Sequence, residues 1–127
     1  MKKNRQAAST IMLVEDDDLN RSMLRQLLQN SGYRVVEAGN GAEALEVARR
    51  ERPIVILMDL DLPGLDGIGA TRRIREQVEL RKIPIVMTTA FDTPAIRAAA
   101  YDAGCNEYLV KPLDAAKLKT LISSLAP

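Results

Sequence analysis

Short apolar runs alternate along the chain with longer segments in which apolar residues recur every three or four positions. Five such runs, rich in Val, Ile and Leu, are typical of strands, and the most apolar of them are typical of strands buried on both faces. We expect these strands at 10–14, 33–37, 54–58, 83–89 and 107–110.

Helical periodicity and capping residues occupy the intervals between the runs. Gly32 supplies a left-handed stop after the first apolar stripe, and Asn40 followed by Glu43 resembles a capping box. Thr93 before Pro94 is typical of a helix start. We expect helices that end near Asn30, Arg50, Val78 and Gly104, and a last helix that Asp114 caps.

Five strands that alternate with five helices over short connections predict an α/β fold. The pattern favours a parallel sheet with right-handed crossovers and helices on both faces. Ligands of such sheets bind beyond the carboxyl ends of the strands, where the strand order reverses. Residues 1–9 are polar and are expected to be a flexible N-terminal segment, and 10–126 to form one domain.

Composition narrows the function. Of 127 residues, 18 are basic and 17 acidic, so the net charge of +1 gives no electrostatic reason to expect a nucleic-acid or membrane partner. The apolar run at 11–14 is too short for a signal peptide or a membrane span. The single cysteine, Cys105, excludes an internal disulfide and favours a reducing compartment, so a cytoplasmic protein is expected.

Two residue types are scarce or missing. The chain has no histidine, which excludes an imidazole base, nucleophile or metal ligand. Aromatic residues make up only 3% of the chain and include no tryptophan, so a stacking platform for bases or a flavin is not expected.

Polar side chains follow four of the five predicted strands. In a doubly wound sheet these strand ends face one crevice, which would gather three carboxylates, a hydroxyl and an ammonium group. The residues concerned are Glu15, Asp16, Asp59, Thr88, Thr89 and Lys111.

Carboxylates about 4 Å apart repel by about 4 kcal/mol at an effective dielectric constant of 20, so an opposing charge is needed. Oxygen ligands without histidine or cysteine suit a hard divalent cation, and Mg²⁺ is the natural candidate. An aspartate beside such an ion can attack phosphorus while the metal neutralises the transferring group.

Four segments, at 11–17, 55–67, 84–90 and 107–112, resemble the receiver domains of bacterial two-component response regulators. No single segment would suffice, but the four occur in the right order and spacing, and the resemblance covers residues 10–126. It implies a flavodoxin-like receiver fold with strand order 2-1-3-4-5; a chemotaxis receiver is itself an example of that order.

The resemblance also implies the centre of the site. Asp59 would be the phosphoacceptor. Glu15 and Asp16 would hold Mg²⁺ together with Asp59, and the backbone carbonyl of Asp61 would complete the protein's share of the coordination.

The remaining roles concern the switch. Thr89 would be the hydroxyl that moves to the phosphoryl group, and Lys111 would contact that group; the bond from Lys111 to Pro112 is often cis in this family. Tyr108 would be the aromatic residue that rotates inward on activation. Asp61 and Phe91 should influence phosphoryl lifetime, in a direction that the sequence leaves open.

The implied function is a phosphorelay switch rather than an enzyme. A histidine kinase or histidine phosphotransfer protein would phosphorylate Asp59. The fourth helix, fifth strand and fifth helix would form the surface for a downstream protein. A phosphorylation-dependent homodimer is a further possible partner state. If the chain is complete, no DNA-binding module follows 125–127, and output is then expected through protein docking.

Two other functions compete with this one. The segment from Met58 to Asp61 resembles the first motif of haloacid-dehalogenase phosphatases, but Leu62 and Pro63 do not continue that motif. The acid pair of those phosphatases lies downstream of the motif, whereas here the pair Glu15 and Asp16 lies upstream. A degenerate receiver that serves only as a scaffold would lack one of the five residues that phosphorylation requires in this family. All five are present: Glu15, Asp16, Asp59, Thr89 and Lys111.

Overall fold

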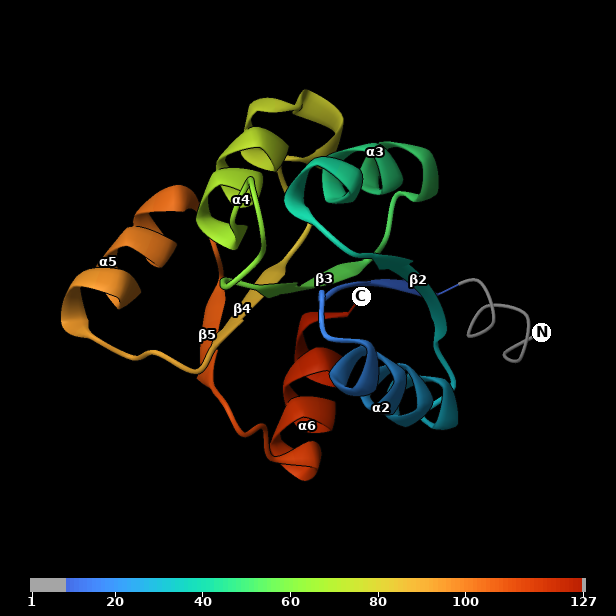
Figure 1. The fold of residues 1–127 in the computed structure, drawn as a ribbon. Coiled ribbons are helices and arrows are strands. Elements are labelled where there is room, and N and C mark those ends of the chain that lie inside the picture. The colour runs from blue at the N-terminus through green and yellow to red at the C-terminus, as the bar shows by residue number, and fades with distance from the viewer. Residues whose placement is uncertain (1–8, 127) are drawn as a thin grey trace.

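The five apolar runs form the strands of one parallel sheet, in a computed structural model that describes residues 9–126 (Figure 1). Of the N-terminal segment expected to be flexible, residues 1–8 lie outside the described residues. The strands are β1 (Thr10–Val14), β2 (Arg34–Ala38), β3 (Val55–Asp59), β4 (Ile85–Thr89) and β5 (Glu107–Val110). Their order, β2-β1-β3-β4-β5, is the predicted one.

Three strands begin later than predicted. Strand β3 begins at Val55 rather than at Ile54, and helix ends use the first residues predicted for β2 and β4. The Tyr33 N–H donates to the Leu28 carbonyl and so closes the preceding helix, and β2 begins at Arg34. The Ile83 N–H donates to the Leu80 carbonyl and closes a 3₁₀ turn, and β4 begins at Ile85.

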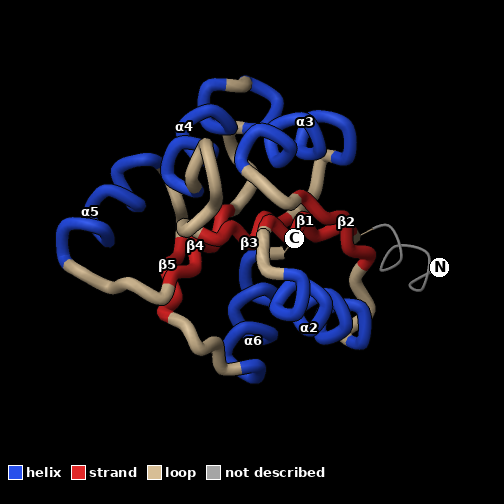
Figure 2. Tube along the Cα trace, viewed as in Figure 1, coloured by secondary structure: helices blue, strands red, loops and turns tan. Residues whose placement is uncertain are grey.

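Helices cover both faces of the sheet (Figure 2). One face carries α3 (Gly41–Glu51), α4 (Gly67–Glu76) and α5 (Pro94–Ala103), and the other carries α2 (Asp18–Asn30) and α6 (Ala115–Leu125). Helix α4 ends two residues before the predicted Val78, because Gln77 is extended and Val78–Leu80 forms the 3₁₀ helix η1.

Each α-helix begins at a residue whose side chain accepts the backbone N–H three positions later. The five caps are Asp17, Asn40, Asp66, Thr93 and Asp114. Glu43 bonds back to the N–H of Gly39 rather than to that of Asn40. Gly32 and Gly104 follow their helices with φ of 97° and 117°, as the left-handed stop requires.

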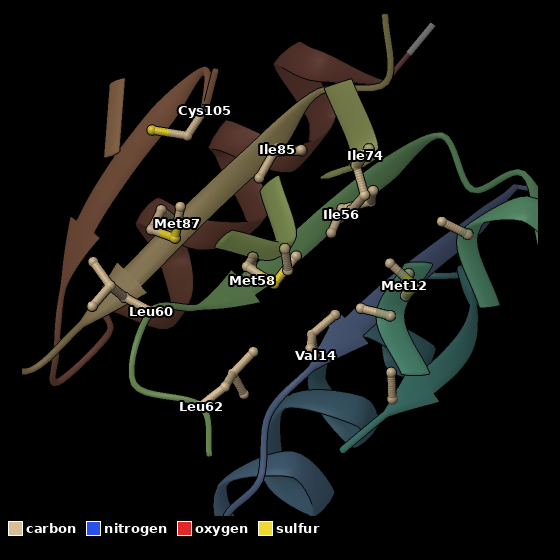
Figure 3. Packing of buried hydrophobic residues seen from close by; sticks show 14 of the residues in the cluster. Met12, Val14, Ile56, Met58, Leu60, Leu62, Ile74, Ile85, Met87 and Cys105 are labelled. Atoms are coloured by element: carbon tan, nitrogen blue, oxygen red, sulfur yellow. The ribbon is translucent and has the colours of Figure 1, made fainter. Parts of the chain in front are cut away.

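The core consists of two layers, one on each face of the sheet. Alternate residues of β1, β3 and β4 pack under α3, α4 and α5, among them Met12, Ile56, Met58 and Met87 (Figure 3). The intervening residues, such as Ile11, Leu13 and Leu57, pack under α2 and α6. Because both faces are covered, nearly every position of these strands is apolar.

Helix α4 begins directly against the end of β3. A Cβ at Gly67 would lie 2.4 Å from the Asp59 carbonyl oxygen and 2.7 Å from the Leu60 Cα, so only glycine allows this approach. The first turn of α4 therefore supports the backbone at the end of β3.

Among residues 9–126, no helix has the length and apolar content needed to cross a membrane.

Candidate functional site

Three carboxylates meet at the carboxyl edge of the sheet. Glu15 and Asp16 follow β1, and Asp59 is the last residue of the adjacent strand β3. One carboxylate oxygen from each lies within 4.8 Å of the other two. Glu15 and Asp59 are buried, with 2% and 3% exposure, whereas Asp16 is exposed. The structure thus brings together the three acids that the sequence placed at one edge.

An ammonium group faces two of these acids. The Lys111 Nζ lies 3.2 Å from Glu15 Oε1 and 3.2 Å from Asp59 Oδ2. The Lys111 N–H donates to the carbonyl of Thr89, which fixes the lysine backbone at the end of β5. The Lys111–Pro112 bond is cis, as the family resemblance led us to expect.

The electrostatics of the site favour a bound cation. Burial, together with the negative charge of Asp59, raises the pKa of Glu15 above its ordinary value of 4.5, against the opposing effects of the Asp17 N–H and Lys111. Burial alone would lower the pKa of Lys111, but the charges of Asp59 and Glu15 outweigh it and raise that pKa. Lys111 is therefore charged at neutral pH and offsets part of the repulsion.

Asp61 connects the acids to the Thr89 hydroxyl. Its N–H donates to Asp59 Oδ1 over 3.0 Å, and its Oδ2 accepts the Thr89 hydroxyl over 3.1 Å. The Phe91 N–H in turn donates to Thr89 Oγ1 over 3.0 Å. Thr89 is completely buried, whereas the Asp61 side chain is exposed.

Tyr108 is buried next to this group. Its hydroxyl donates to the Phe91 carbonyl over 3.4 Å, and the guanidinium carbon of Arg97 lies 4.7 Å from the centre of its ring. Arg97 is itself paired with Asp92. Burial raises the pKa of Tyr108, with a further contribution from the charge of Asp92. The ring is thus already inside, and its rotation on activation stays a prediction.

Two contacts of the site were not predicted from the sequence. The Arg21 Nη1 donates to the Glu15 carbonyl over 2.9 Å, while the same guanidinium pairs with Asp18 and Glu37. This arginine ties the backbone after β1 to α2 and β2. Its spacing from Asp18 indicates only a helix-surface pair. The second missed contact is made by the Asp61 side chain with Thr89. The family resemblance gave Asp61 a carbonyl ligand and an influence on phosphoryl lifetime, but no bond to Thr89.

The donor set fits a hard cation. Three clustered carboxylates supply the oxygen ligands that Mg²⁺ prefers, and Mg²⁺ usually keeps waters and takes one or two carboxylates plus phosphate oxygens. Lys111 lies beside two of the acids and could contact a phosphate oxygen. The arrangement can therefore bind a metal–phosphate unit next to a buried carboxylate.

Comparisons with known proteins agree with this chemistry. The sequence profile of the response regulator receiver domain matches residues 11–123. The polar-differentiation response regulator DivK of Brucella anthropi is 37% identical over 115 residues, which cover 91% of this chain and 94% of DivK.

Two solved structures share the fold. The receiver domain of the sensor histidine kinase PA1611 from Pseudomonas aeruginosa, solved with magnesium coordinated in its active site cleft, superposes with a TM-score of 0.87 at 39% identity, covering 94% of this chain and 98% of that one. The chemotaxis protein CheY4 of Vibrio cholerae gives a TM-score of 0.87 at 29% identity, covering 92% and 98%.

Proposed function

The chain belongs to the response regulator receiver family of two-component signalling, and from that membership we propose that Asp59 accepts a phosphoryl group from a phosphohistidine of a partner protein. The observation that carries the proposal is the meeting of Asp59 with Glu15, Asp16 and Lys111 at one sheet edge. The protein is a signalling receiver rather than an enzyme. We take residues 10–126 as the receiver domain.

The site residues divide the work of phosphoryl transfer. An oxygen of Asp59 attacks phosphorus, the bond from phosphorus to the donor nitrogen breaks, and an acyl phosphate forms. Lys111 is charged and lies 3.2 Å from Asp59, so it can follow the transferred group and neutralise one of its oxygens. The Asp61 N–H holds the other Asp59 oxygen and fixes the orientation of the carboxylate.

Mg²⁺ is the proposed cofactor. The side chains of Glu15, Asp16 and Asp59 and the backbone carbonyl of Asp61 would hold it, since the acids lie within 4.8 Å of one another. When bound, the ion neutralises charge on the phosphoryl oxygens. Arg21 holds the Glu15 carbonyl and keeps that ligand at the sheet edge.

Switching would run from Thr89 through Phe91 to Tyr108, because these residues are joined by hydrogen bonds. We place the docking surface for a downstream protein on α5, β5 and α6, the surface expected from the sequence. Exposed apolar side chains support this assignment: Tyr101 lies on α5 and Val110 on β5, with 44% and 40% exposure. A phosphorylation-dependent homodimer through this surface is the alternative use of the same face.

The phosphodonor would dock in a different place. A groove of about 620 Å³ between α2 and the start of α6 opens next to Glu15 and Lys111 and is lined by apolar side chains such as Met23 and Leu24. Met23 is 61% exposed. A histidine kinase or phosphotransfer protein bound there would bring its phosphohistidine to Asp59. Because such kinases take their phosphoryl group from ATP, we propose that the protein works in the cytoplasm.

Phosphorylation by a small donor tests the central proposal. Acetyl phosphate with Mg²⁺ should add one phosphoryl group to the intact protein by mass spectrometry, and Asp59→Asn should abolish the addition. Omitting Mg²⁺ should also suppress it. A phosphoryl group that still appears on Asp59→Asn, or wild-type protein that never gains one, would contradict the assignment.

A second comparison tests the docking groove. Met23→Lys places a charge in an apolar groove, so transfer from a phosphohistidine protein should slow about tenfold relative to phosphorylation by acetyl phosphate. Val78→Lys is the control, because Val78 is exposed at η1 and does not line this groove. An unchanged ratio of the two rates in Met23→Lys would place the donor elsewhere.

A further inference from the structure

The Thr89 hydroxyl has one hydrogen to donate, and the nearer of the two acceptors within its reach is the Asp61 carboxylate. The distance from Thr89 Oγ1 to Asp61 Oδ2 is 3.1 Å, and the Phe91 carbonyl lies farther away, at 3.4 Å. The oxygen of the same hydroxyl accepts the Phe91 N–H over 3.0 Å. A hydroxyl with its single hydrogen directed to one oxygen cannot donate it to another. Thr89 can therefore bind either Asp61 or a phosphoryl oxygen, but not both.

From this exclusivity we propose that the Asp61 carboxylate is a positioning residue that holds Thr89 in the resting state and must release it when Asp59 is phosphorylated. The inference rests on the proposed function of Asp59. It assigns a role to the Asp61 side chain, which is separate from the role of its backbone carbonyl in metal binding. We call this contact the Asp61–Thr89 latch.

The latch is placed so that it can open at little cost. The Asp61 side chain is exposed, and its carboxylate accepts the Thr89 hydroxyl. Within residues 9–126, Asp61 forms no ion pair. A released carboxylate would pass into water and keep its hydration. Thr89 is completely buried, and after release from Asp61 its hydroxyl keeps the Phe91 carbonyl as a more distant acceptor, at 3.4 Å. A phosphoryl oxygen on Asp59 offers a charged and therefore stronger acceptor.

Phosphorylation also acts on Asp61 directly. A phosphoryl group carries nearly two negative charges and replaces the single charge of the Asp59 carboxylate, so the negative charge at this residue rises by about one. The Asp61 N–H bonds to Asp59 Oδ1 over 3.0 Å, so the added charge forms close to the Asp61 carboxylate. Like charges at such range repel. The repulsion displaces the Asp61 carboxylate, which is the acceptor that Thr89 leaves. The phosphoryl oxygens on Asp59 are the acceptors that it gains. Both effects open the latch in the same direction.

The latch is also connected to the docking surface. The Phe91 N–H donates to Thr89 Oγ1, and the Phe91 carbonyl accepts the Tyr108 hydroxyl over 3.4 Å. A movement of Thr89 therefore displaces the Phe91 backbone to which Tyr108 is bonded. Arg97 covers the Tyr108 ring and is paired with Asp92. The position of Thr89 thus sets the position of residues on α5 and β5.

A charge-matched mutant cycle tests the latch. Asp61→Asn keeps an acceptor oxygen without the charge, and Asp61→Ala removes the acceptor as well. Thr89→Val removes the hydroxyl at nearly constant volume. The affinity of each variant for beryllium trifluoride, an analogue of the phosphoryl group, is measured with Mg²⁺ by the shift of backbone amide resonances. Urea unfolding checks that every variant is folded.

With Thr89 present, Asp61→Ala should bind the analogue about fivefold more tightly than Asp61→Asn, which is the effect of one neutral hydrogen bond. With Thr89→Val present, the two should bind equally, because no latch exists in either. Equal affinities in both backgrounds, or the same difference in both, would overturn the latch.

The experiment separates this inference from the proposed function. Wild-type protein that does not bind beryllium trifluoride with Mg²⁺, and is not phosphorylated by acetyl phosphate, would contradict the role of Asp59. Wild-type protein that binds the analogue without coupling between Asp61 and Thr89 would overturn the latch alone.

Discussion

The interior of the β3 strand and its last residue differ sharply in chemistry although both are buried. Val55 to Met58 are apolar, have at most 1% exposure, and pack on both faces of the sheet. Asp59, with 3% exposure, carries a carboxylate beside two further acids. The interior gains stability from burial, whereas the strand end loses some through burial and repulsion of charge.

The comparison teaches that structural and functional residues are separated by a single position along the strand. The site acids are held by backbone contacts to rigid elements, such as the N–H of Glu15 on the Ala38 carbonyl and the Gly67 N–H on the Leu60 carbonyl. Their mutual repulsion is only partly offset by Lys111. Ligand binding should therefore stabilise the strand ends far more than the strand interiors.

The largest effect is expected in the strand interior. Ile56→Ala removes a completely buried side chain and should lower the free energy of unfolding by about 3 kcal/mol. Asp59→Asn removes a charge from the acidic cluster and should lower the stability of the metal-free protein by far less, or raise it. Urea unfolding without Mg²⁺ measures both. A greater loss in Asp59→Asn than in Ile56→Ala would reverse the comparison.

A slightly smaller effect is expected where the two regions meet. Gly67→Ala would force its Cβ against the backbone of Asp59 and Leu60 and should cost about 2 kcal/mol of stability. It should also slow phosphorylation by acetyl phosphate, because Asp59 moves. Gly39→Ala is the matched control, since a Cβ at Gly39 would meet no atom within 4 Å and the φ of this residue is not positive. Equal stabilities of the two variants would mean that α4 adjusts freely.

Mg²⁺ should stabilise the protein through the strand ends. At a concentration ten times its dissociation constant it should add about 1.4 kcal/mol to the free energy of unfolding. Asp16→Asn should remove most of this gain at the same Mg²⁺ concentration, because it removes one acid of the cluster. Glu46→Gln changes the charge equally on an exposed position of α3 and should keep the full gain. Equal gains in the two variants would exclude Asp16 as a ligand.

The metal-free site should also make stability depend on pH. The pKa of Glu15 is raised in the folded protein, first by burial and then by Asp59, so folding favours its protonated form. The stability that this proton confers is present below pH 4.5, the ordinary pKa, and is lost as pH rises through the folded pKa. Glu15→Gln should therefore gain stability relative to wild type as pH rises from about 4 to about 7. A difference that shrinks with rising pH would contradict the raised pKa.

The smallest effect concerns a polar atom in the interior. Thr71 on α4 is completely buried, and its hydroxyl is the buried side-chain group without a hydrogen-bond partner among the described residues. Thr71→Val removes the hydroxyl at nearly constant volume and should raise the free energy of unfolding by about 1 kcal/mol. Thr71→Ser keeps the hydroxyl and should not be stabilising. A loss of stability in Thr71→Val would indicate that the hydroxyl has a partner after all.

The architecture and the composition of the site could be predicted from patterns along the chain. Apolar runs indicated which segments are strands, because a strand covered on both faces is apolar at most of its positions. Capping residues such as Asn40 and Thr93 marked the helix starts, and the strand ends carried Glu15, Asp59 and Lys111 to one edge. These features depend on local pattern and on the general geometry of parallel sheets, so they can be predicted without coordinates.

Which of these polar groups bond to one another depends on how the elements pack in three dimensions. The Asp61 side chain meets Thr89 across 28 positions of sequence, Arg21 reaches the Glu15 carbonyl, and Gly67 touches the backbone of Asp59. No local pattern encodes such contacts, because they depend on distances set by the packing of whole elements and on the choice among competing hydrogen-bond partners. The pattern of the chain placed the acids at one edge, and the packing of its elements set the nearest acceptor of the Thr89 hydroxyl.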